Sequence, residues 1–154
     1  MGAGLGAGLG AGAGNNAKGF LIGGLGAGAG NNLTGIGLSL GAVGAGDRFK
    51  GIGVGGLAVG GGDSMVGIAI AGGAVGSSNI RGLSIAGAYA RVEDGILRGA
   101  SIAGYNDIRG AQHGLTIGIY NYARQLHGIQ LGLINVARNN PTWARVLPLL
   151  NLHL

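Results

Sequence analysis

The chain contains no cysteine, only 2 prolines in 154 residues, and few charged side chains, which make up 10% of the composition. The absence of cysteine excludes disulfides and thiolate metal sites, so stability must come from packing and backbone pairing. The scarcity of proline, without a strict Gly-X-Y period, excludes a collagen-like chain. Glycine, in contrast, supplies 39 residues. Because so many side chains are small, the backbone must approach itself closely in the folded state.

The sequence consists of nine tandem units, most of them about 16 residues long. Two sets of residues recur with this period in the first units. The glycines are Gly19, Gly35, Gly51 and Gly67, and the turn-forming residues are Asn15, Asn31, Asp47, Asp63 and Asn79. A fixed period of this kind is typical of repeat architectures, in which each repeat contributes one structural unit.

Large apolar residues alternate with small ones within each unit, for example in residues 36–40. Alternation with period two indicates a strand, and a second short apolar group in each unit indicates a second strand. The Asn/Asp-rich end of the unit predicts a turn. The sequence therefore predicts an all-β fold: a β-solenoid, similar to a parallel β-helix, of about nine coils of roughly 16 residues. At about 4.8 Å per coil, such a rod is roughly 43 Å long.

The alternation also predicts which side chains point inward. We expect an interior of Ile, Leu and Val, including Ile70, and an exterior of Gly, Ala, Ser and Thr, because stacked coils must bury their apolar residues together. The small residues then form a flat outer face. Flat Gly/Ala faces can pack on one another, so this pattern predicts homo-oligomers or fibres, formed through that face or through the N-terminal strand edge.

The chain divides into two predicted segments: glycine-rich solenoid repeats over residues 1–138 and a C-terminal capping segment over residues 139–154. The second segment contains both prolines and the only tryptophan, Trp143. We expect Trp143, Leu147, Leu149 and Leu150 to fold over the final coil, with proline preventing further strand pairing.

A rival architecture is an antiparallel meander that closes into a small outer-membrane β-barrel. It would explain the hydrophobicity and the alternating segment 145–154. Consecutive barrel strands turn at opposite ends, however, whereas the turn residues here recur identically in every unit. This regularity favours the solenoid.

A candidate binding edge is formed by arginines that occur late in their units and by tyrosines close to them in phase. Aromatic rings can stack on sugars or bases, and a basic ridge can hold a polyanion. Its members are Arg81, Arg98, Arg109, Tyr105, Tyr120, Tyr122, Arg124 and Arg138. With a net charge of +5, the chain would attract anionic glycans or lipid weakly. The basic charge is therefore compatible with membrane association, and we expect no specific nucleic-acid partner.

Catalytic chemistry finds little support in the sequence. His113 and His127 precede successive unit-ending glycines and would stack one coil apart, but no third metal ligand shares their register. Asn106, Asn121 and Asn135 occupy matching positions and predict a hydrogen-bonded ladder along the coil axis. We therefore expect a non-enzymatic protein with no catalytic, metal or cofactor site.

Two C-terminal units carry a recognisable repeat: GLTIGIYNYAR over residues 114–124 and GIQLGLINVAR over residues 128–138. They resemble bacterial surface-repeat proteins, in which segments like GLQIGLINVA recur in tandem, and RVLPLLN over residues 145–151 resembles a common ending of such chains. The resemblance implies an extracellular or cell-envelope protein of bacterial origin, although no signal-peptide pattern precedes the first repeat. It carries no catalytic residues to transfer.

The leading functional hypothesis is accordingly a structural surface-repeat protein, a rigid β-rod that supports self-association or adhesion. The alternatives are a polyanion- or glycan-binding module that uses the arginine and tyrosine edge, and the small outer-membrane β-barrel.

Overall fold

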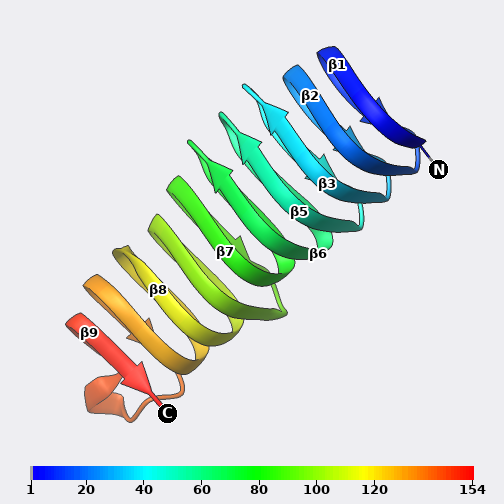
Figure 1. The fold of residues 1–154 in the computed structure, drawn as a ribbon. Coiled ribbons are helices and arrows are strands. Elements are labelled where there is room, and N and C mark those ends of the chain that lie inside the picture. Colours follow the sequence, from blue (N-terminus) through cyan, green and yellow to red (C-terminus); the bar gives the residue numbers. More distant parts are fainter. Residues whose placement is uncertain (1) are drawn as a thin grey trace.

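The protein is a β-solenoid, as the repeat pattern predicts (Figure 1). The computed structural model describes residues 2–154, with side chains from residue 9 onward. Its strands are β1 (Gly2–Ala13), β2 (Asn16–Ala29), β3 (Asn32–Ser39), β4 (Ala42–Ala45), β5 (Arg48–Gly55), β6 (Ala58–Ala71), β7 (Ala74–Val92), β8 (Ile96–Ala137) and β9 (Val146–His153), and a short 3-10 helix, η1, spans Thr142–Ala144.

The coils stack in parallel with the period seen in the sequence. Strands β2 and β3 pair Gly19 with Gly35, and β3 and β5 pair Gly35 with Gly51. Among the strands of residues 2–154, β9 alone is antiparallel to its neighbour, β8. This register fits the solenoid and sets aside the antiparallel meander that was its rival.

The number of turns differs from the expected nine. The strand order β1-β2-β3-β5-β6-β7-β8-β9 describes about 6 turns. The strands are also fewer than the sequence units, because β8 runs through 42 residues without a break. Several sequence units are therefore joined in one continuous, bent strand.

A column of glycines forms one corner of the coil. Gly35 has φ +133°, Gly51 has φ +136°, and the matching glycines up to Gly128 also have positive φ. A side chain would be strained in this conformation, and a Cβ on Gly35 would collide with the carbonyl oxygen of Gly19 in the coil below. The recurring glycine is therefore required both by the bend and by the close stacking of the coils.

The interior is narrow and is filled in an alternating way. Leu33, Phe49 and Met65 point inward ahead of the corner glycine, while Val43 and Val59 point inward from the opposite arm of the coil. A Cβ on Gly37 would lie 2.5 Å from Cγ1 of Val43, and one on Gly53 would lie 2.9 Å from both Phe49 and Val59. Small residues are needed between the large ones because the opposing side chains already occupy the space.

This packing corrects the predicted orientation of the strand that follows each corner glycine. Ala69 is fully buried, whereas Ile70, predicted to lie in the interior, is 37% exposed. The large residues of this strand therefore point outward and the small ones inward. The prediction holds for the other arm, where Val43 is buried beneath the outward Ala42 and Gly44.

The interior becomes partly polar in the C-terminal half, where buried amide side chains lie beside apolar ones such as Leu97 and Leu126. Asn106 donates from Nδ2 to Oδ1 of Asn121 at 2.8 Å, and Asn121 donates in the same way to Asn135 at 2.8 Å. Ser101 joins this chain by donating to Oδ1 of Asn106 at 2.7 Å. The predicted asparagine ladder is thus confirmed, and all of its members are buried inside the coil.

The last segment covers the end of the stack in a way that the sequence did not suggest. Strand β9 pairs with the final stretch of β8, and buried Asn140 donates to Oδ1 of buried Asn151 at 2.8 Å. Trp143, expected to fold over the final coil, is instead 80% exposed, and Leu149 also points to solvent. Amide side chains make the contacts beneath this segment: Asn151 donates to the backbone carbonyls of Asn135 and Ala144, and the Asn135 side chain donates to the carbonyl of Leu147.

Candidate functional site

A sheet of exposed and half-buried large apolar side chains runs along one side of the rod. It consists of the outward positions one and three residues after each corner glycine, which the parallel register aligns in two columns. We call this surface the apolar face. Its members are Phe20, Ile22, Ile36, Leu38, Ile52, Val54, Ile68, Ile70, Leu83, Ile85, Ile102, Leu115, Ile117, Ile129, Leu131, Leu150 and Leu152.

The apolar face continues without interruption onto the last strand. Leu150 and Leu152 of β9 pair with Leu131 and Ile129 of β8. Directly paired residues point to the same side of a sheet, so β9 adds another row of leucines to the face. The residues between them alternate inward, as buried Asn151 does.

The bend between the two arms of the coil extends this surface sideways. The exposed side chains there, which we call the apolar corner, are Leu25, Leu40, Leu57, Ile119 and Leu133. Two hollows lie along the border of face and corner. One of about 440 Å³ is lined by residues that include Ile117, Leu131 and Leu149, and one of about 280 Å³ by residues that include Ile22 and Leu38.

A row of basic side chains borders the opposite edge of the apolar face. Lys18, Lys50, Arg81 and Arg98 each precede a corner glycine, and the register stacks their positions in one column. All four side chains are exposed. We call them the basic row. Further along the chain, His113 and His127 precede Gly114 and Gly128 in the same way, and their rings stack with centroids 4.8 Å apart.

The other arm of the coil carries a second outer surface whose chemistry changes along the rod. In the first coils it is flat, because its outward positions hold residues such as Gly28, Ala42, Gly44 and Gly60. The predicted flat Gly/Ala face therefore exists on this arm alone, and the other arm carries the apolar face. In the last coils the outward positions of this second surface hold tyrosine and charged residues.

Three tyrosines form a stacked column at this C-terminal end. The rings of Tyr89 and Tyr105 lie 5.4 Å apart, and those of Tyr105 and Tyr120 lie 4.8 Å apart and nearly parallel. Tyr89 was not part of the predicted edge, although it shares the register of Tyr105. The stacking occupies ring faces, so the tyrosines present mainly their edges and hydroxyl groups to solvent.

The structure brings five of the eight predicted edge residues together. They line a groove of about 470 Å³ together with Asp94 and Asp107, namely Tyr105, Arg109, Tyr120, Tyr122 and Arg124. Arg81 and Arg98 belong to the basic row instead, and Arg138 does not line the groove. The prediction that the arginines form a single edge is therefore wrong. The units differ in length and place their arginines at different positions of the coil.

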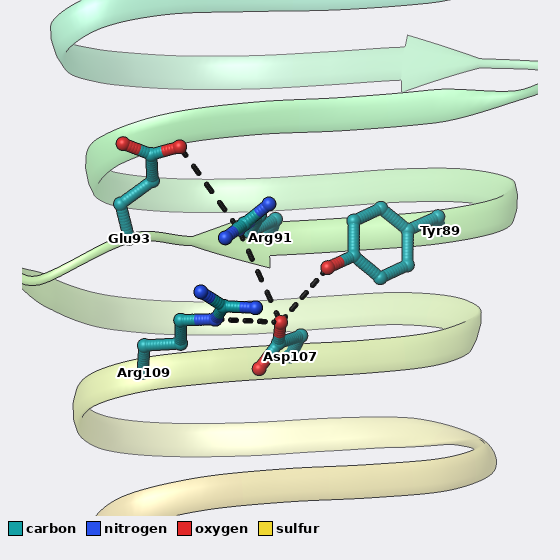
Figure 2. Close-up of polar contacts among 5 residues, drawn as sticks. All are labelled: Tyr89, Arg91, Glu93, Asp107 and Arg109. Carbon is teal, nitrogen blue, oxygen red and sulfur yellow. Dashed lines mark hydrogen bonds and ion pairs between the residues drawn. The ribbon is translucent and has the colours of Figure 1, made fainter.

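Asp107 is the centre of a polar cluster beside this groove (Figure 2). Its Oδ2 accepts a hydrogen bond from the hydroxyl of Tyr89 at 2.8 Å and another from Nε of Arg109 at 3.0 Å. Nε of Arg91 lies 4.0 Å from the same Asp107 oxygen and 3.9 Å from Oε1 of Glu93. Asp107 is nearly buried, so these donors satisfy a carboxylate that is largely removed from water.

Three side chains in or beside this cluster have raised pKa values: Tyr89, Tyr105 and Arg109. Partial burial raises the pKa of Tyr89 above its usual 10.0, and the hydrogen bond to Asp107 raises it further. Partial burial also raises the pKa of Tyr105, with the nearby charge of Asp107 as the next cause. The bond to Asp107 raises the pKa of Arg109. Arg109 therefore stays charged, but its charge is partly compensated.

Two further observations bear on chemistry. Within the described part of the chain, no group of three or more His, Cys, Asp or Glu side chains is arranged to hold a metal ion. Nor does any helix among the described residues have the length and hydrophobicity needed to cross a membrane.

Comparison with known proteins adds no relative: no family model, curated protein or solved structure matches the chain significantly. The resemblance of residues 114–138 to bacterial surface repeats therefore stays a prediction.

Proposed function

We propose that this chain is a non-enzymatic structural repeat protein, a rigid β-rod that attaches to another surface through its apolar face, in self-association or adhesion. The observation that carries the proposal is the continuity of that face. It holds two aligned columns of large apolar side chains from Phe20 of β2 to Leu152 of β9, in which Ala100 is the one small residue among the described positions. We also propose the bacterial cell envelope as its location.

The size of the face supports attachment. With strands about 4.8 Å apart and a rise of about 3.3 Å per residue, the face and the apolar corner cover about 40 Å by 15 Å, or about 600 Å². Singly exposed apolar residues are ordinary, whereas a contiguous patch of this size is at the upper end of what a monomer exposes, and such patches are often functional. Rigidity follows from the parallel register, which ties each coil to the next along both arms.

The test places a charge on the face without disturbing the core. The double variant Ile70→Asp/Ile102→Asp should fold, lose concentration-dependent association in sedimentation velocity and lose retention on octyl-coated beads. The matched control is Ala42→Asp, which adds a charge to the exposed flat surface of the other arm. Unchanged association and retention in the folded double variant would contradict the proposal.

A second candidate function, polyanion or glycan binding, rests on the groove lined by Tyr105, Tyr120, Tyr122, Arg109 and Arg124. Because Arg109 is bonded to Asp107, Arg124 should contribute more of the attraction. Salt-sensitive retention on a sulfated polysaccharide should therefore fall more in Arg124→Gln than in Arg109→Gln. Equal retention of both variants and the unmodified chain would exclude this groove as the site.

A further inference from the structure

The area of the apolar face makes a second copy of the chain a weakly bound occupant. Stable protein interfaces bury about 800 Å² on each partner. The face and the apolar corner together offer about 600 Å² of flat surface, estimated from strand spacing and rise. A face-to-face pair would therefore lie at the weak end of specific interfaces. A lipid layer has no such threshold, because it conforms to the whole face and to its edges.

The charges around the face favour an anionic layer. Each residue of the basic row is separated from the apolar face only by the corner glycine, as Lys50 is from Ile52. The acidic Asp47 and Asp63 lie at the preceding turn, four residues before Gly51 and Gly67. Asp107 lies on the other arm of the coil. A surface that meets the apolar face thus meets the basic row first, in the arrangement that interfacial segments use on anionic membranes.

The backbone pairing and the shape of the apolar face also fit a lipid layer. The strands beneath the face are paired in ladders, as β3 is with β2 and β5, so the apolar face brings no row of unpaired backbone groups into lipid. The two apolar hollows, of about 440 Å³ and 280 Å³, are shallow and open and add apolar contact area along the border of the face.

We infer that the apolar face binds the surface of an anionic lipid layer, with the basic row at the headgroups and the rod lying flat. This inference rests on the proposed attachment function and names its partner. The partner is defined by its chemistry: an apolar layer bordered by negatively charged groups.

The experiment is vesicle flotation with the full chain, using phosphatidylcholine vesicles with and without added phosphatidylserine. The chain should float with both and more strongly with the anionic vesicles. Ile70→Asp/Ile102→Asp should reduce binding at least tenfold on both, because two charges would have to enter the apolar layer. Lys50→Gln/Arg81→Gln should lose roughly fivefold per removed charge on the anionic vesicles only. Ala42→Asp, on the other arm, should retain binding to both, and thermal melts verify that each variant folds.

Three other outcomes are distinguishable. If the chain stays with the unbound fraction on both vesicles yet forms a dimer that Ile70→Asp abolishes, the lipid inference is overturned and attachment through the apolar face stands. If neither vesicles nor a dimer respond to Ile70→Asp, both proposals fail. If binding occurs but Lys50→Gln/Arg81→Gln leaves it unchanged on anionic vesicles, the role of the basic row is wrong and the inferred partner with it.

Discussion

The two halves of the rod share one backbone path but differ in what fills it. Around residues 33–75 the interior is apolar, with Leu33, Phe49 and Met65 packed against valines of the opposite arm. Around residues 101–135, Asn106, Asn121 and Asn135 take the inward positions of those valines, and Ser101 takes the position of Ala69; these side chains are joined by hydrogen bonds. The coil therefore accepts either chemistry, provided that each inward side chain fits the narrow space and finds a partner.

The difference matters for register. The first units keep a constant 16-residue period, so identical backbone shapes stack without further instruction. The later units vary in length: the bond from Ser84 to Ser101 spans 17 residues, that from Asn106 to Asn121 spans 15, and that from Asn121 to Asn135 spans 14. Directional hydrogen bonds penalise misalignment more sharply than apolar contacts do. The polar interior thus maintains stacking where the repeat itself is irregular.

The largest effect should come from a charge placed in the apolar interior. Ala69 is fully buried, so Ala69→Asp should destabilise the fold by about 4 kcal/mol or more, because the carboxylate finds no partner there. The neighbouring Ile70→Asp lies on the apolar face and should cost less than about 1 kcal/mol. Urea unfolding of both variants checks this, and equal losses would refute the assignment of inside and outside.

A smaller effect should follow from exchanging the two interiors at one position of the coil. Asn121→Val leaves the amides of Asn106 and Asn135 without their partner, and Val59→Asn places an amide among apolar side chains. Each should lower the free energy of unfolding by about 2–3 kcal/mol. A stabilised Asn121→Val variant would show that the ladder is dispensable and that the halves do not differ in the way described.

The smallest effect should be a pH dependence confined to the C-terminal half, which contains all 4 tyrosines. Burial and Asp107 raise the pKa of Tyr89 above 10.0 in the folded chain. The stability that Tyr89 contributes is therefore fully present below the pKa of the tyrosine in the unfolded chain, and it is lost as the pH rises through its pKa in the folded chain. Urea unfolding from about pH 9 to about pH 11 should show a shallower loss of stability in Tyr89→Phe than in the unmodified chain. Parallel curves for the two would contradict the raised pKa.

The fold class could be predicted because its signals are periodic. The recurring glycines and the Asn/Asp turns marked one coil per unit, and Gly19 to Gly128 indeed form the positive-φ corner. The orientation of the strand around Ile70 could not be obtained in this way. Alternation shows that two faces differ but not which one is inside, and placing the large residues inward ignored the opposite arm, whose Val43 and Val59 already fill the space.

The candidate sites were predictable only in part. The proximity of Tyr105 and Tyr120 was predicted from their similar positions within the repeat. Tyr89 could have been found by extending the same register one coil back. The sequence prediction combined residues of the groove and of the basic row into one edge, because Arg81 and Arg109 both occur late in their units. The two arginines lie on different sides of the coil. The apolar face was missed altogether, since its side chains were assigned to the core.

The most direct test of the central claim uses the absence of cysteine from the chain. Single cysteines at positions 69 and 70 can be labelled with a small maleimide under native conditions, on a fraction that light scattering shows to be monomeric. If the apolar face is outside, Ile70→Cys should react rapidly and Ala69→Cys should react only after unfolding. Rapid labelling of Ala69→Cys with protection of Ile70→Cys would place the large residues inside and contradict the apolar face.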